Sequence, residues 1–258
     1  MLPDIQASYD KREIELDQVG VAGVRYPITF RDGTLRQSGI ASIDLTVTLQ
    51  ADRRGTHMSR MIELIHGHLA ELDPRELPTI LKTAAIRLDA DRLKLTASLP
   101  VATLVSSPAS GKQSWQTSDV TLTASLAETV SEVTTRVTTD VTSLCPCSKA
   151  ISDYGAHNQR SAVTLAVVGL GDTPYPLSVA SAINMIRGIG SSPVYPVVKR
   201  PDERVITMEA YDHPAFAEDI ARDLSQQCRA QGLPHQVKVR NIESIHSHDA
   251  VAVVTWMG

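Results

Sequence analysis

The chain has 258 residues, of which 42% are hydrophobic, and it carries 25 Lys and Arg against 29 Asp and Glu. This length can bury the core of one large domain or of two smaller ones. The net charge of -4 argues against a nucleic-acid carrier, whose affinity depends on neutralising phosphates. With three cysteines, no disulfide framework, no apolar run long enough to span a membrane and no signal-peptide core, we expect a soluble, cytoplasmic protein.

The first part of the chain predicts two strands that enclose two helices. Residues 43–50 alternate apolar and polar side chains, which is the pattern of a half-buried strand. Apolar residues at helical spacing over 58–72 predict a helix with Thr56 as its cap. A second helix should begin near Pro74, since proline fits the first helical turn, and residues 93–101 alternate again as a strand.

The serine-rich segment 106–117 has the composition of a loop and is the best internal boundary. We therefore expect a first module over 1–110 and a second over 111–258. In the second module we expect strands at 120–126, 131–143, 163–167, 237–239 and 251–253, and helices at 179–186 and 216–232. This pattern predicts an α+β fold of antiparallel sheets with helices packed on one face, whose open edges oligomerisation would close.

Cys145 and Cys147 flank Pro146, and His157 follows at short range. If the preceding strand continues through the pair, its parity places both sulfurs on one face, and the proline marks the strand end. Thiolate and imidazole are ligands that a borderline-soft divalent ion prefers, although such a pair can also be ordinary core or turn residues. The third cysteine, Cys228, lies on the apolar stripe of a predicted helix, and we expect it in the core.

Six segments carry a joint resemblance. They are Val19-Gly20-Val21 through Arg25-Tyr26-Pro27, Gly55-Thr56-His57-Met58-Ser59-Arg60, Cys145-Pro146-Cys147-Ser148-Lys149, Tyr154-Gly155-Ala156-His157-Asn158-Gln159-Arg160, Lys199-Arg200-Pro201-Asp202-Glu203, and Glu243-Ser244-Ile245-His246-Ser247-His248-Asp249-Ala250. Each is weak alone, but together and in this order the chain resembles the type IB GTP cyclohydrolase I family. The resemblance implies the tunnelling fold with two modules per subunit, and a homotetramer with active sites between subunits.

The same resemblance implies the chemistry. GTP would be hydrolysed at C8 of guanine to formate and 7,8-dihydroneopterin triphosphate, the first step of folate and pterin synthesis, with a divalent ion as cofactor. Cys145 and His157 would ligate the ion, and Cys147 would be an alternative ligand or a proton-handling thiol. Zn²⁺, Mn²⁺ and Fe²⁺ all accept one sulfur and one nitrogen, so the metal stays open.

His246 and His248 have equal parity in an expected strand, so both imidazoles could face one cavity as general acids. Without the resemblance, such a pair is as readily a metal site or a wet surface. A carboxylate is the natural acceptor for the two adjacent donors of guanine, and the candidates are Glu243, Glu209 and Glu203. Each of these glutamates could also lie on a solvated face.

The triphosphate needs cations, and five basic residues lie in or near the family segments. They are Arg60, Lys149, Arg160, Lys199 and Arg200. The planar fork of arginine suits phosphate oxygens, and some of these side chains would come from a neighbouring subunit. Any one of them could be a surface charge without a role.

The sequence departs from the family pattern at two places. The glutamate expected as a further metal ligand before Lys199 is absent, because residues 191–198 contain no carboxylate, and Met208 stands where a glutamate would anchor guanine, with Glu209 adjacent. These departures keep two alternatives open. One is a metal-free nitrile reductase of the same fold, against which the histidines argue, and the other is a catalytically altered pterin-binding homologue.

Overall fold

The computed structural model describes residues 5, 6 and 8–258. These residues form two compact units, each drawn from three segments. The first unit comprises Met1–Leu99, Thr121–Thr135 and Val168–Pro176, and the second comprises Pro100–Val120, Arg136–Val167 and Leu177–Gly258. The boundary expected at residue 110 lies within a segment of the second unit, and the division into two fused modules stays a prediction. None of the described helices is long and apolar enough to cross a membrane.

The elements alternate between long strands and short helices. In chain order they are β1 (Leu16–Asp32), β2 (Leu35–Leu49), α1 (Met58–His68), β3 (Glu71–Leu72), a 3₁₀ turn (Pro74–Glu76), α2 (Leu77–Leu88), β4 (Arg92–Ser106), β5 (Gln113–Ala127), β6 (Val130–Leu144), α3 (Pro146–Ile151), β7 (Asn158–Leu170), α4 (Val179–Arg187), β8 (Ser192–Pro193), α5 (Arg200–Asp212), α6 (Ala217–Ala230), β9 (His235–Asn241) and β10 (Ala250–Trp256). Hydrogen-bonded neighbours follow the order β10-β9-β7-β6-β5-β4-β2-β1-β3, with β8 paired to β6.

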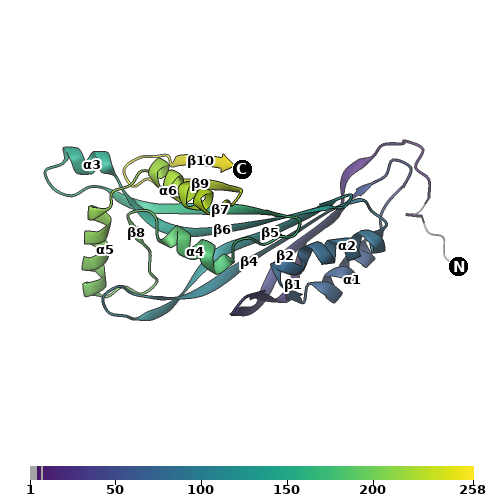
Figure 1. Cartoon of the computed structure of the whole chain (residues 1–258), viewed down its shortest axis with the longest axis horizontal. Helices are drawn as coiled ribbons and strands as arrows, with labels where there is room; N and C mark the ends of the chain where they lie inside the picture. The colour runs from purple at the N-terminus through teal and green to yellow at the C-terminus, as the bar shows by residue number, and fades with distance from the viewer. Residues whose placement is uncertain (1–4, 7) are drawn as a thin grey trace. The chain divides into compact units, whose positions relative to one another are not determined.

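In the first unit, β2 pairs antiparallel with both β1 and β4. Along β2, Ile43, Leu45 and Val47 are buried while the residues between them are half-buried, so the strand predicted from alternation is confirmed. Helices α1 and α2 lie against one face of these strands (Figure 1). The core of this unit is therefore the layer between the helices and the sheet.

Two details of the prediction for the first helix were wrong. The helix ends at His68, and Leu72 belongs to the short strand β3, which runs parallel to the end of β1 at Thr29 and Phe30. Its N-cap residue is His57, without a side-chain capping bond, so Thr56 does not cap it. Leu72 is buried in β3. Its apolar side chain therefore matches the helical spacing although the residue lies outside the helix.

Half of the segment 106–117 is strand, because β4 runs to Ser106 and β5 begins at Gln113. Its turn is closed by bonds from the backbone N–H and Oγ of Ser107 to the carbonyl of Lys112, at 3.0 and 3.1 Å, and Gly111 adopts φ +65°. Serine and glycine here build the tip of a hairpin, not a linker.

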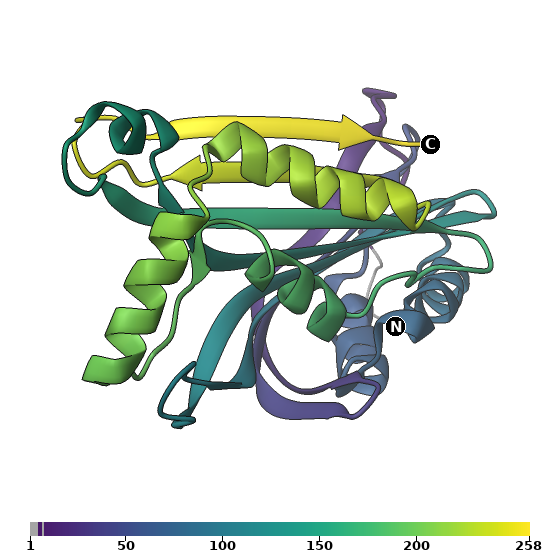
Figure 2. The same cartoon turned by 60° about the vertical axis from the view of Figure 1, so that its left-hand side comes forward.

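In the second unit, β9 pairs antiparallel with β7 and β10, and α4 and α6 lie along one face of these strands (Figure 2). Helix α6 buries an apolar stripe that includes Ile220, Leu224 and Cys228, so the core position expected for Cys228 is confirmed. Burial raises the pKa of the Cys228 thiol to about 11. This cysteine is therefore inert packing.

A buried aspartate starts α5. Asp202 accepts hydrogen bonds from the backbone N–H of Lys199, Ala109 and Ser110, at 2.9, 2.9 and 2.7 Å, and from Ser110 Oγ at 2.7 Å. Burial opposes ionisation of this carboxyl, but the bonds from Ser110, Lys199 and Ala109 prevail and lower its pKa to about 2. The carboxylate thus caps α5 and ties it to the β4–β5 hairpin tip.

We expect Asp202→Asn to destabilise the protein near neutral pH, because the amide keeps one acceptor and turns a donor toward backbone N–H groups. The folded pKa is depressed from 3.8 to about 2, so the stabilisation is present above about pH 4 and is lost as the pH falls toward 2. Urea unfolding midpoints at several pH values should therefore differ between wild type and variant at pH 6 and converge between pH 4 and 2. Asp153→Asn, at an exposed aspartate, serves as the control, and equal midpoints at pH 6 would refute the assignment.

Candidate active site

Cys145 is not part of a strand that continues to Cys147. Strand β6 ends at Leu144, Cys145 is the extended N-cap residue of α3, and Pro146 occupies the first turn of that helix. The argument from strand parity was therefore wrong, because proline here begins a helix. Cys145 is half-buried and Cys147 is exposed, and both thiols are free.

Backbone and side-chain bonds bring Cys145 and His157 to the same place. The N–H of Cys145 donates to the carbonyl of His157 at 3.0 Å. Ser148 lies between them, since its N–H donates to Cys145 Sγ at 3.4 Å and its Oγ accepts from the N–H of His157 at 3.3 Å. The end of β6 and the start of β7 thus present the thiol and the imidazole at one edge.

His246 and His248 lie in the loop between β9 and β10, not in a strand as expected. Their rings are nevertheless stacked, with centroids 5.2 Å apart and planes inclined by 21°. The loop is closed by an ion pair in which Arg240 Nε lies 2.6 Å from Asp249 Oδ2. The folded loop, and not strand parity, pairs these imidazoles.

Ser244 connects this loop to His157. The N–H of Ile242 donates to the carbonyl of Arg160 at 2.9 Å, which keeps the start of the loop against β7. Ser244 Oγ then lies 3.4 Å from His157 Nδ1 and 3.3 Å from Gln159 Oε1. The structure therefore brings the loop that carries both histidines beside the Cys145–His157 edge.

The three candidate carboxylates differ in environment. Glu209, on the half-buried side of α5, accepts a hydrogen bond from Ser192 Oγ at 3.1 Å, and Ser192 pairs with β6 three residues before Cys145. Glu243 is half-buried at the start of the histidine loop, and Glu203 is exposed. The segment around Ser192 is the one in which a glutamate was expected, and the side chain of Glu209 reaches it from α5.

The basic candidates are divided between the two units. In the second unit, Lys149 donates to the carbonyl of Tyr211, with its Nζ 4.2 Å from the centre of that ring, and Arg160 Nη1 lies 3.7 Å from Asp140 Oδ2. Lys199 and Arg200 are exposed at the start of α5. Two of these four cations are therefore already engaged.

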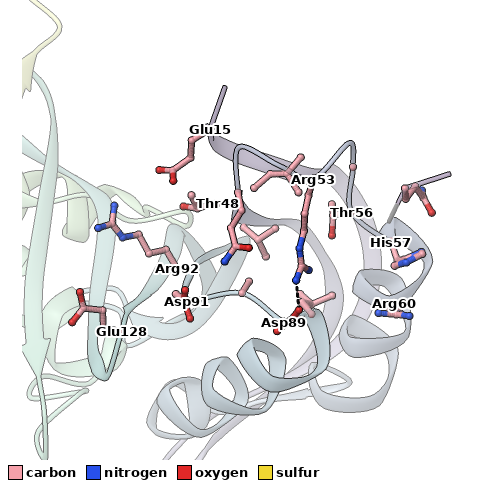
Figure 3. A pocket seen from close by; sticks show the side chains of 17 residues that line it. Glu15, Thr48, Arg53, Thr56, His57, Arg60, Asp89, Asp91, Arg92 and Glu128 are labelled. Atoms are coloured by element: carbon pink, nitrogen blue, oxygen red, sulfur yellow. Dashed lines mark hydrogen bonds and ion pairs between the residues drawn. The ribbon is translucent and has the colours of Figure 1, made fainter. Parts of the chain in front are cut away.

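Arg60 belongs to the first unit, where it lines a cavity of about 570 Å³. Figure 3 shows Arg60 and His57 at the end formed by the start of α1, and Arg92 and Glu128 at the opposite end. Within it, the ion pair of Arg53 with Asp89 has an Nη2 to Oδ2 distance of 2.5 Å. The cavity has acidic and basic walls, so it is not a purely cationic phosphate cradle.

Comparison with known proteins identifies the family. The profile described as "Type I GTP cyclohydrolase folE2" matches residues 2–252. The chain is 38% identical over 256 residues to GTP cyclohydrolase FolE2 2 of Cupriavidus metallidurans, covering 98% of this chain and 94% of that protein. It is 41% identical over 259 residues to GTP cyclohydrolase FolE2 of Bordetella avium, covering 98% and 96%.

The chain belongs to the FolE2 family of type I GTP cyclohydrolases. The expected relationship to type I GTP cyclohydrolases is confirmed, while the family is FolE2, which replaces the type IB subtype named from the motifs. Among solved structures, uricase from Arthrobacter globiformis matches with a TM-score of 0.52 and 11% identity, covering 94% of this chain and 93% of that one. At this identity the likeness concerns the fold alone, and it is consistent with the tunnelling fold.

FolE2 membership suggests dependence on a divalent metal, and the residues at the Cys145–His157 edge fit one in part. The Cys145 Sγ already accepts the N–H of Ser148, and His157 Nδ1 is engaged by Gln159 at 2.8 Å, which leaves Nε2 for an ion. Among the described residues, no three His, Cys, Asp or Glu side chains gather as one metal-binding group. The part of the chain that the structure describes thus offers one sulfur and one nitrogen, without a carboxylate beside them.

The sequence analysis of this FolE2 protein missed three side chains at the site. Ser148 and Ser244 contact the two candidate ligands, and Gln159 accepts from the imidazole of His157. Ser148 stands three residues after the N-cap Cys145, and Gln159 stands two residues after His157, which directly precedes β7. Both spacings indicate a contact once the positions of α3 and of the start of β7 are known.

We expect the three thiols to differ in reactivity toward iodoacetamide. Cys147 is exposed and should react first, Cys145 more slowly, and Cys228 after unfolding alone, because it is fully buried and its pKa is raised. Zn²⁺ should slow the modification of Cys145 and leave Cys147 unchanged, as measured by mass spectrometry of the cysteine peptides. Equal protection of Cys147 would instead make it a ligand, and no protection of Cys145 would exclude it as one.

Proposed function

We propose that this protein is a GTP cyclohydrolase that converts GTP to formate and 7,8-dihydroneopterin triphosphate. Family membership over nearly the whole chain supports this reaction, and one structural observation supports a site for it. That observation is the proximity of Cys145 and His157, which Ser148 connects, beside the Ser244 contact that links His157 to the loop of the stacked His246 and His248. The relatives reported above are named GTP cyclohydrolases, which favours this function over the nitrile reductase alternative.

Cys145 and His157 would hold the divalent ion, which when bound supplies Lewis acidity and lowers the pKa of water for attack on C8. Both C–N bonds of C8 must break, C8 leaves as formate, and each released nitrogen takes up a proton. We assign the transfer of those protons to His246 and His248, because an imidazole side chain can both accept and donate a proton. Their stacked rings lie in an exposed loop, so they can also exchange protons with solvent.

Glu209 is the carboxylate that we propose as the guanine anchor. It is half-buried, held by Ser192 and carried on a helix, whereas Glu203 is exposed. A carboxylate in this setting accepts both the ring N–H and the exocyclic amine of guanine. Lys199 and Arg200 at the start of α5, with Lys149 and Arg160, would meet the triphosphate, and Arg60 would contribute from a neighbouring subunit.

We further propose a homotetramer with active sites between subunits. In the described sheet, β10 is an edge strand, and its side chains Val251 and Val253 are 58% and 55% exposed. An apolar edge of this kind pairs readily with another copy. The free cysteines support a cytoplasmic, reducing location, and two fused modules per subunit remain part of the proposal.

Cys145→Ala should abolish both metal retention and formate release from GTP, because it removes the sulfur ligand. The measurements are metal content after purification without chelators and a formate assay with Zn²⁺, Mn²⁺ or Fe²⁺ added. Cys228→Ala is the matched control and should keep metal and turnover while losing about 1 kcal/mol of stability. Full turnover and full metal content in Cys145→Ala would reject the ligand role, whereas a wild-type protein that binds metal without releasing formate would support the altered pterin-binding homologue.

His246→Gln and His248→Gln should each lower kcat by about 10²- to 10⁴-fold, because a glutamine cannot transfer protons. Metal content should stay at the wild-type level, which separates this role from ligation. His68→Gln, at an exposed histidine of α1, is the control and should leave kcat unchanged. Loss of metal in either loop variant would show that the pair ligates the ion, and an unchanged kcat would exclude it from proton transfer.

A further inference from the structure

A buried network of hydrogen bonds stands behind His157. Its inner members are Ser143, Gln159 and Asn241, which are 1%, 8% and 3% exposed. Ser143 is on β6, Gln159 on β7 and Asn241 on β9, so the network crosses three adjacent strands. Buried polar groups are costly unless each has a partner, so the direction of every bond here is constrained.

The backbone carbonyl of Ala215, in the loop between α5 and α6, determines which group donates in each hydrogen bond of the network. Ser143 Oγ lies 2.7 Å from this oxygen, and a carbonyl can only accept, so the hydroxyl of Ser143 must donate to it. The loop is held there by a second bond, from the N–H of Ala215 to the carbonyl of Leu144 at 3.1 Å. Ser143 has one proton, so its oxygen can only accept from its other neighbours.

Those neighbours are the side-chain amides of Asn241 and Gln159. Asn241 Nδ2 donates to Ser143 Oγ at 3.0 Å, and Asn241 Oδ1 accepts from the hydroxyl of Ser161. Gln159 Nε2 lies 3.5 Å from Ser143 Oγ and must be the donor there. This fixes the orientation of the Gln159 amide and turns Oε1 toward His157.

Gln159 Oε1 accepts from His157 Nδ1 at 2.8 Å and from Ser244 Oγ at 3.3 Å. Because an amide oxygen has no proton to give, His157 must carry its proton on Nδ1. In a neutral imidazole the lone pair then lies on Nε2. The chain of bonds from Ala215 through Ser143 and Gln159 thus selects one tautomer of His157.

We propose that Gln159 is a positioning residue that holds His157 with Nδ1 protonated, so that Nε2 is the nitrogen presented to a divalent metal ion. This rests on the proposed function in that His157 is taken as a ligand of the ion. Histidine ligands in metal sites generally donate their second ring N–H to an acceptor that fixes the ring, and loss of such an acceptor costs 10- to 100-fold in metal affinity. Here the acceptor is the side-chain amide of Gln159. Its orientation depends, through Ser143, on the carbonyl of Ala215 in the α5–α6 loop.

The experiment measures the tautomer and the metal affinity separately. Protein labelled with ¹⁵N at Nδ1 of its histidines is studied metal-free by solid-state NMR, and the His157 signal is assigned by its absence in His157→Gln. We expect a protonated Nδ1 in wild type, loss of that preference in Gln159→Leu, and its recovery in Gln159→Glu, which keeps an acceptor oxygen. The Zn²⁺ dissociation constant, from competition with a chelator, should rise about 10- to 100-fold in Gln159→Leu and stay within a few-fold of wild type in Gln159→Glu.

Gln236→Leu, at an exposed glutamine of β9 that bonds to Thr255, is the matched control and should change neither quantity. Ser143→Ala keeps Gln159 but removes the group that orients it, so it should give a mixed tautomer, and it serves if Gln159→Leu fails to fold. An unprotonated Nδ1 in wild type, or a tautomer and affinity unchanged in Gln159→Leu, would overturn the proposal. Absence of GTP turnover in wild type would count against the cyclohydrolase function without altering the tautomer, so the two failures are distinguishable.

Discussion

The hydrogen bond from the backbone N–H of Cys145 to the carbonyl of His157 joins the end of β6 to the residue just before β7. It holds a thiol and an imidazole at one end of these strands although they are twelve positions apart in the chain. Between them, α3 contributes Ser148, whose backbone N–H and hydroxyl each contact one of the two residues. Without this hydrogen bond, the two proposed metal ligands Cys145 and His157 would lie on independent loops. Ordering both loops around an ion would then cost conformational entropy.

Next to Cys145 and His157, the carbonyl of Ala215 determines the hydrogen-bond directions of a row of buried side chains. Each member of the Ser143, Asn241 and Gln159 network could bond in more than one direction when isolated, but the acceptor at Ala215 leaves one consistent arrangement. The same residues pin the α5–α6 loop, so the helix that carries Glu209 and the strand that precedes Cys145 share one support. Packing and site geometry are thus coupled, and a change in this network would affect both.

Local patterns predicted the elements that have one buried face. The strand around 43–49 and helix α6 show clear periods of two and of about 3.6 residues, because every second residue or every turn faces the core. The prediction did not include β1, whose first half has no buried residue and is interrupted by register shifts, with Gly23 at φ +68°. It also missed α5, which buries Asp202 and Ala210 and has no apolar stripe for periodicity to detect.

By itself, the sequence determined the donor types and the relationship to type I GTP cyclohydrolases: a sulfur at 145, an imidazole at 157, two further imidazoles at 246 and 248, and a match to that family over residues 2–252. Tertiary structure decided how these groups meet. In the folded chain Cys147 lies on a helix and not on a strand, and the two loop histidines are stacked. Glu209 also accepts a hydrogen bond from Ser192. Tertiary structure also chose the tautomer of His157. These outcomes depend on strand register and on the direction of hydrogen bonds between residues distant in the chain, and neither is encoded in the spacing of neighbouring side chains.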